Sequence, residues 1–166
     1  MTQEDKQLLL KDLCARLPYN VICKCYHTEF DEWDGKPFVA IYNETLRNID
    51  ANGAFLAGGF SYEIDEIKPY LRTMSSMTEE ESKEISILYG IKDILSIKIK
   101  DEYIEVVVDD GVCSTEIRTI WYDEIISSIE IFDLLNVHHF DYRGLIPKGL
   151  AIEVTKENNQ YEEINL

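Results

Sequence analysis

The chain has little of several features that would assign it to a class at once. It has no apolar run near the ~20 residues that a bilayer-crossing helix needs, and its first residues, Met1 to Lys6, are charged rather than leader-like. Its 4 cysteines show no framework spacing, so they are most simply reduced thiols. These absences favour a cytoplasmic location and argue against a disulfide-bonded secreted domain.

Positive charge is also scarce. Lysine and arginine number 16 against 32 aspartates and glutamates, for a net charge of −16, and the basic residues are scattered singly. Direct binding to nucleic acid would need a local basic patch, so we do not expect it. Residues 1–77 have a net charge of −4 and residues 78–166 one of −12. The simplest role of this acidity is solubility; the alternatives are contact with a basic partner and mimicry of nucleic acid.

The motifs of common catalytic sites are missing. There is no Gly-x-Ser-x-Gly elbow, and Gly58-Gly59 lacks the Lys-Ser/Thr that follows a phosphate-binding loop. Cys113 follows the acidic Asp109-Asp110-Gly111 turn, where nearby carboxylates would raise its pKa and disfavour a reactive thiolate. The sequence therefore predicts no catalytic residue, no resident metal and no cofactor.

The composition is that of a globular protein, with 45% hydrophobic residues, and apolar and polar residues alternate with helical or strand periodicity. Helical spacing and capping boxes predict helices that begin near Thr2, Thr78 and Ser127. Period-2 alternation predicts short strands between them and after the last helix. The expected strands lie within residues 21–26, 38–42, 54–57, 62–67, 94–99, 103–108, 115–121 and 150–154.

These elements predict an α+β protein. An N-terminal helix is followed by a small antiparallel sheet, which could curl into a half-open barrel, with a turn at Asn52-Gly53. A second helix, a β-meander and a C-terminal helix come next, and we expect the last helix to cover the meander through Ile129, Phe132 and Leu135. His139 would continue that helical series.

The same pattern predicts how the chain divides. Residues 1–72 would form the helix-and-sheet lobe, and residues 73–155 the lobe of helix, meander and helix. Residues 156–166 would be a polar, frayed tail.

Residues 136–146 hold the densest group of functional side chains, with two imidazoles, two aromatic rings, a carboxylate and a guanidinium. His138, His139 and Asp141 suggest a metal-dependent hydrolase or nuclease. Adjacent residues point in different directions, however, and helical zinc pairs need i,i+3 or i,i+4 spacing. The alternative is structural: His139 packs, His138 caps helix carbonyls and Asp141 caps the next turn.

A second candidate metal group lies near the N-terminus. Cys23, Cys25 and His27 would share one face of a strand. Three such residues span about 13 Å, which is too far for one ion. Two buried thiols beside a histidine is the simpler interpretation.

Tyr142 and Arg143, with His138, are the residues we predict to form a contact surface, because arginine and tyrosine are enriched at binding hot spots. The alternative is that Arg143 neutralises acidic neighbours within the fold and that Tyr142 lies at the rim of the core. In that case the whole segment would join structural layers rather than react.

Several blocks of the chain carry a resemblance: residues 4–6 with 13–19, 66–72, 74–81, 138–146 and 148–151, about a quarter of the chain. Together they resemble a family of small uncharacterised acidic proteins from gut anaerobic bacteria, their phages and mobile elements. Members of this family have no assigned activity, so the resemblance implies a mobile-element setting and no catalytic roles. It also implies that residues 20–62 and 90–126 vary while the blocks form a shared frame.

The sequence thus predicts a non-enzymatic adaptor or interaction protein with a protein partner and no contact with membrane. One alternative is an acidic decoy that blocks a nucleic-acid-binding protein. The other is a metal-dependent hydrolase or nuclease that uses His138, His139 and Asp141.

Overall fold

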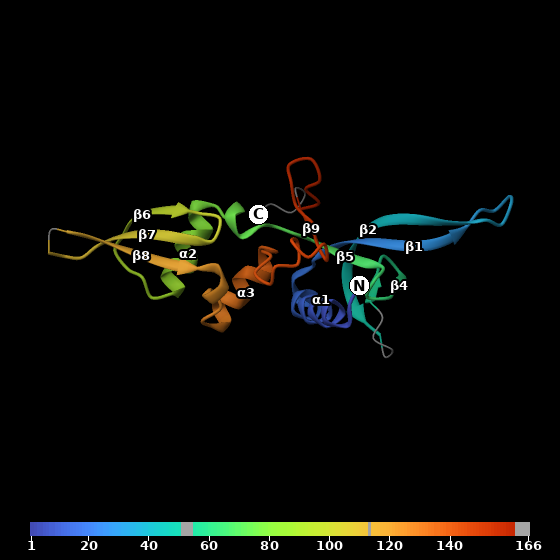
Figure 1. Ribbon diagram of the computed structural model, residues 1–166, viewed down its shortest axis with the longest axis horizontal. Helices are drawn as coiled ribbons and strands as arrows, with labels where there is room; N and C mark the ends of the chain where they lie inside the picture. Colours follow the sequence, from blue (N-terminus) through green and yellow to red (C-terminus); the bar gives the residue numbers. More distant parts are fainter. Residues whose placement is uncertain (51–54, 113, 162–166) are drawn as a thin grey trace. The chain divides into compact units, whose positions relative to one another are not determined.

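A computed structural model describes residues 1–50, 55–112 and 114–161 of the chain. These residues form three α-helices and two sheets, so the predicted α+β class is confirmed (Figure 1). The elements are α1 (Gln3–Arg16), β1 (Ile22–Phe30), β2 (Pro37–Ile49), β3 (Phe55–Ala57), β4 (Phe60–Tyr62), β5 (Ile67–Leu71), α2 (Glu79–Leu88), β6 (Ile94–Ile99), β7 (Tyr103–Asp109), β8 (Thr115–Trp121), α3 (Ile129–Val137) and β9 (Ile152–Glu153). The turn expected at Asn52-Gly53 and the residue Cys113 lie outside the described residues.

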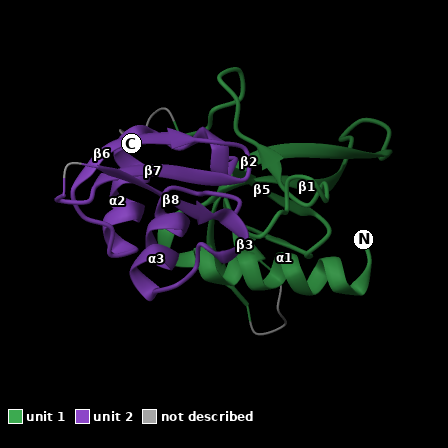
Figure 2. Cartoon of the chain, turned by 60° about the vertical axis from the view of Figure 1, so that its left-hand side comes forward, with its two compact units in different colours: residues 1–71, 143–166 green, residues 72–142 purple. Residues whose placement is uncertain are grey.

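The chain divides into two compact units (Figure 2). Unit 1 is Met1–Leu71 with Arg143–Leu166, and unit 2 is Arg72–Tyr142. The expected second lobe, residues 73–155, was therefore too long at its C-terminal end. The segment returns to unit 1 because β9 pairs in parallel with β5, and because Leu145 and Leu150 are buried in the core of unit 1.

Unit 1 is a six-stranded sheet with α1 packed on it. The strand order is β4-β3-β2-β1-β5-β9, and the sheet is open rather than closed into a barrel. α1 begins at a reciprocal capping box between Thr2 and Asp5, as the sequence predicted. Its Leu9 and Leu13 are fully buried in a core shared with the sheet residues Cys23 and Cys25. Burial of each such aliphatic side chain contributes about 1.5–3 kcal/mol.

Unit 2 is the predicted meander with α2 and α3 packed on one face. The strand order is β6-β7-β8, and every pair is antiparallel. α2 begins at the predicted capping box, in which Thr78 and Glu81 satisfy each other's backbone donors. Alternate residues of β7, Ile104 and Val106, are fully buried in the same core as Ile85 of α2.

α3 differs in detail from its prediction. Its N-cap is Ser128, whose hydroxyl accepts from the Ile131 backbone N–H at 3.3 Å, and not Ser127. Of the three expected anchors, Leu135 is buried, but Ile129 is 64% exposed. The buried face contains Ile131, Leu134 and Leu135. α3 has apolar residues on most sides, so spacing alone could not decide which of them face the sheet.

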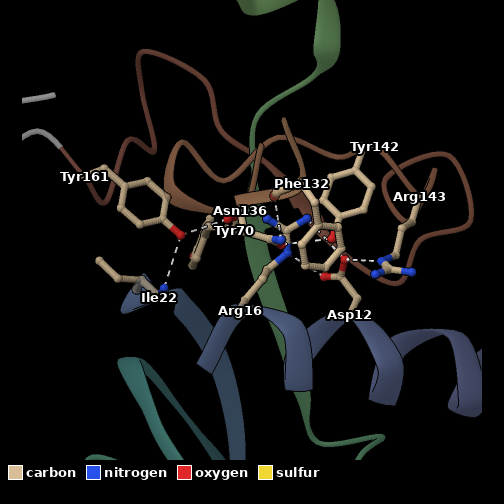
Figure 3. Close-up of polar contacts among 9 residues, drawn as sticks. All are labelled: Asp12, Arg16, Ile22, Tyr70, Phe132, Asn136, Tyr142, Arg143 and Tyr161. Atoms are coloured by element: carbon tan, nitrogen blue, oxygen red, sulfur yellow. Dashed lines mark hydrogen bonds and ion pairs between the residues drawn. The ribbon is translucent and has the colours of Figure 1, made fainter. Parts of the chain in front are cut away.

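The chain remains packed on unit 1 up to Tyr161, beyond the point at which the sequence predicts a frayed tail. Tyr161 is buried in unit 1. Its hydroxyl accepts from the Ile22 backbone N–H at 3.1 Å and donates to the Tyr70 carbonyl at 2.9 Å (Figure 3). Burial raises the pKa of this phenol, so it remains a donor. The described part of the predicted tail is therefore part of the unit and is not frayed.

No helix among the described residues is long and apolar enough to cross a membrane.

Candidate functional site

The Glu81 carboxylate is the centre of a polar cluster in unit 2. The capping box places it in the first turn of α2, where it accepts from the Thr78 backbone N–H at 2.8 Å. It also accepts from both terminal nitrogens of the Arg72 guanidinium, at 2.7 and 3.0 Å. The Nδ1 atom of His138 lies 3.0 Å from its Oε1 atom. One carboxylate thus links the connector, the start of α2 and the C-cap of α3.

The surroundings of Glu81 also set its charge. Its side chain is only 11% exposed, and burial by itself would raise the pKa of the carboxyl. The hydrogen bonds from His138, Arg72 and Thr78 outweigh burial and hold that pKa well below its usual value of 4.5. A carboxylate with so low a pKa is a poor general base, so this cluster suits a structural role.

Arg72 is held on every side within unit 2. Its guanidinium lies over the ring of Phe140, 4.3 Å from the ring centroid, and it donates to the Ser76 carbonyl at 2.9 Å. Its backbone N–H donates to the His139 carbonyl, and its carbonyl accepts from the Asp141 N–H. His139 has a φ of +58°, so it ends the helical path that the sequence predicted it to continue.

Tyr142 and Asn136 form the other polar contact of the segment in unit 2. The buried Asn136 side chain donates to the Phe132 carbonyl at 2.8 Å and accepts from the Tyr142 hydroxyl at 2.9 Å (Figure 3). The Tyr142 ring packs edge-to-face on Phe132, with centroids 5.8 Å apart. Both polar groups of Asn136 are therefore used inside the unit.

Asp12 is the corresponding carboxylate in unit 1. It is fully buried, and so is Arg16 one helical turn later. The two form a bidentate pair, with Nε–Oδ2 and Nη2–Oδ1 distances of 2.7 and 3.1 Å. Nε of Arg143 lies 3.2 Å from Oδ1 of Asp12 (Figure 3). Two arginines on one buried carboxylate hold α1 and the returning segment of unit 1 together.

The three residues predicted as a contact surface therefore have three different partners within the chain. His138 contacts Glu81, Tyr142 contacts Asn136, and Arg143 contacts Asp12. All three side chains are partly buried. These contacts favour the structural alternative.

The metal hypothesis finds no support in the side-chain geometry. In residues 1–50, 55–112 and 114–161, no three side chains of His, Cys, Asp or Glu come together as an ion would require. His138 instead pairs with Glu81, and His139 and Asp141 meet Arg72 through their backbones.

The thiols of the second candidate group are buried and unreactive. Cys23 and Cys25 are fully buried, and burial raises the pKa of both, that of Cys25 to about 12. The His27 ring packs on the Phe60 ring, with centroids 5.0 Å apart. This is the simpler arrangement that the sequence suggested.

A shallow hollow on unit 2 lies at the start of α3. It is lined by Ile126, Ser127, Ser128, Ile129 and Phe132. Since this lining offers two hydroxyls and no charged group, it has no acid, base or metal ligand with which to act on a substrate.

The feature of the structure that the sequence reasoning missed is the outer part of the β1–β2 hairpin. We call residues 26–41 the arm. Among the described residues, β5 pairs with β1 over residues 23–25, and β3 pairs with β2 over residues 46–49. The base of the arm contacts the rest of unit 1, because the Tyr26 N–H donates to the Glu66 carbonyl and the His27 ring packs on the Phe60 ring. Beyond this base, the arm is a two-stranded ribbon that extends from the rest of unit 1 (Figure 1).

The turn at the end of the arm is held by its own hydrogen bonds. One oxygen of the Asp31 carboxylate accepts from the backbone N–H groups of Trp33 and Asp34, at 2.8 and 3.1 Å. The Asp31 carbonyl accepts from Gly35, whose φ of +65° suits glycine, and the Asp31 N–H donates to the Lys36 carbonyl. Asp34 in turn accepts from Lys36 through backbone and side chain. The turn thus has a defined conformation.

Large apolar side chains are exposed along this arm. Trp33, in the turn, is 95% exposed, and Phe30 is 67% exposed. Val39 and Ile41 pair directly with Thr28 and Tyr26, which lie on the same face of β1 as Phe30. Side chains alternate along a strand, so this face is opposite to the one that carries the core residues Cys23 and Cys25. Phe30, Val39 and Ile41 therefore share one face of the ribbon. Phe38 is exposed on the other face.

The signal for the arm was present in the sequence. Residues 30–38 combine three aromatic side chains with turn formers, whereas a loop that only connects two strands is usually small and polar. The charges and glycine of residues 31–37 are also typical of a connecting loop, and they leave this stretch as a gap between the strands expected at 21–26 and 38–42.

No family model, curated protein or solved structure matches this chain.

Proposed function

We propose that this chain is a protein-interaction module whose binding element is the arm. The observation that supports this most is the exposure of Trp33, at 95%, on a turn that Asp31 holds in one conformation. Isolated exposed apolar residues are common and need no explanation, but a contiguous group of aromatic and branched side chains is typical of an interface.

The energetics favour a binding role for these side chains. A tryptophan or phenylalanine can bury about 150–250 Å², and full burial of a large apolar side chain contributes about 1.5–3 kcal/mol. Within unit 1, Trp33 and Phe30 remain mostly exposed, so little of this stabilisation is used in folding. A preordered turn also lowers the entropy that a partner's binding would cost.

The charge of the arm indicates the chemistry of the partner. Glu29, Asp31, Glu32 and Asp34 stand against the single lysine Lys36 in this stretch. Such a tip would be repelled by phosphate groups of nucleic acid or of anionic lipid. We therefore propose a protein partner with an apolar cleft for Trp33 and basic residues around it.

The setting of this function is also a proposal. Buried thiols with raised pKa values, as at Cys23 and Cys25, are compatible with the reducing cytoplasm. The resemblance of residues 138–146 and the other blocks to small proteins of phages and mobile elements suggests a partner in the bacterial host.

Affinity capture with matched variants tests the proposal. The purified chain is immobilised, exposed to lysate of its source cell, and compared as wild type, Trp33→Ala, Glu32→Lys and Val112→Ala. Glu32 lies outside the hydrogen bonds that hold the turn, and Val112 is an 80% exposed apolar residue on the other unit. We expect a basic protein that wild type and Val112→Ala retain and that Trp33→Ala loses by about tenfold or more. Titration of that purified protein should show weaker binding to Glu32→Lys and at higher salt.

The alternatives give different results in the same experiment. An acidic decoy would capture a nucleic-acid-binding protein that duplex DNA displaces, equally well with Trp33→Ala as with wild type. A hydrolase would show metal-dependent turnover that is lost in His139→Ala. If all four forms of the chain capture the same proteins equally, the arm is not the binding element.

A further inference from the structure

Strand β8 (Thr115–Trp121) forms an open edge of the unit 2 sheet. In the strand order β6-β7-β8, β8 pairs with β7 on one side and with no other strand of the described residues. All of its residues except Ile120 are exposed. An exposed edge strand presents backbone donors and acceptors to another strand, and proteins usually shorten, cover or charge such edges.

The charges on β8 have an order that suits pairing with itself. Glu116 and Arg118 lie on one face, opposite Val108 and Val106 of β7, and they form an ion pair 3.2 Å long within the strand. When two copies of β8 run antiparallel about Ile117, Glu116 of each copy stands opposite Arg118 of the other. Thr115 then stands opposite Thr119.

Other registers lack this match. A shift of the second strand by one residue would turn its side chains to the opposite face of the sheet, so the possible registers differ by shifts of two residues. The two neighbouring ones place Glu116 opposite Glu116 or Arg118 opposite Arg118, and a parallel in-register pair places like charges side by side. Like charges directly opposite each other destabilise a strand pair, so the sequence of β8 specifies a single register.

The open face of the sheet supports the same arrangement. Ile117 is 61% exposed and stands opposite Val107 in the register. On the same face, the rings of Tyr103 and Trp121 pack with centroids 4.8 Å apart. In the arrangement about Ile117, the Ile117 side chains of the two copies meet and extend this apolar row across the junction.

We propose that two copies of this chain associate through β8, antiparallel about Ile117, to form one continuous six-stranded sheet. The partner is a second copy because the strand's own charges complement each other only in that register. This surface lies on unit 2 and is independent of the arm.

Charge exchange tests the proposal in solution. Sedimentation equilibrium is measured from about 10 µM to about 1 mM chain, the range suited to an interface well below ~1,200 Å². An ionic strength of about 0.15 M screens the net charge beyond about 8 Å. The samples are wild type, Arg118→Glu, Glu116→Arg and an equimolar mixture of these two variants, with Trp33→Ala as a control for association through the arm.

We expect wild type and Trp33→Ala to form a reversible dimer. Each charge variant alone should bind itself about tenfold more weakly or worse, because two attractive pairs become repulsive. The mixture should regain the wild-type affinity, since each Glu then faces an Arg. In wild type, backbone amide exchange in residues 115–121 should slow as the concentration rises.

Three results would overturn the proposal. They are a wild type that stays monomeric throughout with unchanged amide exchange in β8, charge variants that associate as well as wild type, and a mixture that stays as weak as its components. Circular dichroism of each variant establishes that it is folded. If a variant is unfolded, the concentration dependence of amide exchange in wild-type β8 decides whether the strand pairs with a second copy.

Discussion

Residues 136–146 and residues 30–38 differ in what their large and charged side chains contact. Residues 136–146 are dense in groups that bind and catalyse, yet His138, Tyr142 and Arg143 each contact another residue of the chain. Residues 30–38 look like a connecting loop, yet Trp33 and Phe30 are among the most exposed large side chains described. Density of functional groups in a sequence does not show which way they face.

The difference follows from what each group gains in the fold. A buried carboxylate needs charged donors close by, and residues 136–146 supply Arg143 to Asp12 and His138 to Glu81. An aromatic side chain in the turn of a projecting ribbon has no core within reach.

Removal of the charge on Asp12 should have the largest effect on stability. In Asp12→Asn, the buried Arg16 and the nearby Arg143 lose their carboxylate, and we expect the free energy of unfolding to fall by about 3–5 kcal/mol. Chemical denaturation measures this. Asp65→Asn is the matched control, because its ion pair with Lys6 is exposed and solvent screening leaves it little effect on stability. Equal losses in the two variants would contradict the structural role of Asp12.

Removal of the charge on Glu81 should have a smaller, pH-dependent effect. We expect Glu81→Gln to lower the free energy of unfolding by about 1.5–3 kcal/mol at neutral pH, because hydrogen bonds to a charged acceptor are lost. The pKa of Glu81 is lower in the folded chain than its usual 4.5, so the unfolded chain binds more protons. The stability due to Glu81 is therefore present above about pH 4.5 and is lost as the pH falls toward the folded pKa.

Denaturation curves between pH 7 and pH 2.5 check this sign. The wild type should lose stability more steeply on the acid side than Glu81→Gln does. Glu80→Gln, a change in the same turn of α2 at an exposed position, is the control and should follow the wild type. A Glu81→Gln curve parallel to that of wild type would show that the ionised carboxylate contributes nothing to the fold.

Removal of the Tyr142 hydroxyl should have the smallest effect of the three. Tyr142→Phe loses one hydrogen bond to the buried Asn136, and we expect a cost of about 0.5–1.5 kcal/mol. Capture of a partner should be unchanged. If stability is unchanged and capture is lost instead, Tyr142 belongs to a contact surface, as its sequence context first suggested.

Local signals in the sequence predicted local structure well. The capping boxes at Thr2 and Thr78 gave the starts of α1 and α2, and the Asp109-Asp110-Gly111 turn with its flanking alternation gave the meander. Each of these signals involves side chains and backbone a few residues apart, so no knowledge of tertiary structure was needed.

The features that the sequence did not predict depend on contacts far apart in the chain. The return of residues 143–161 to unit 1 requires β9 to pair with β5, and burial of Tyr161 requires Ile22 and Tyr70 as partners. The polar cluster at Glu81 likewise joins Arg72 and His138, which are 66 positions apart in the chain. The arm was missed because the charges and turn formers of residues 31–37 are typical of a loop, and the length by which β1 and β2 extend beyond their neighbours depends on pairing with distant strands.

The role of the arm in binding is tested by a paired measurement on Trp33→Ala, with unfolding free energy and partner capture determined on the same preparation. Because Trp33 is 95% exposed, we predict a change in stability within about 0.5 kcal/mol and a loss of capture of about tenfold or more. A Trp33→Ala variant that is clearly less stable, or one that captures the partner as the wild type does, would contradict the assignment of the arm as the binding element.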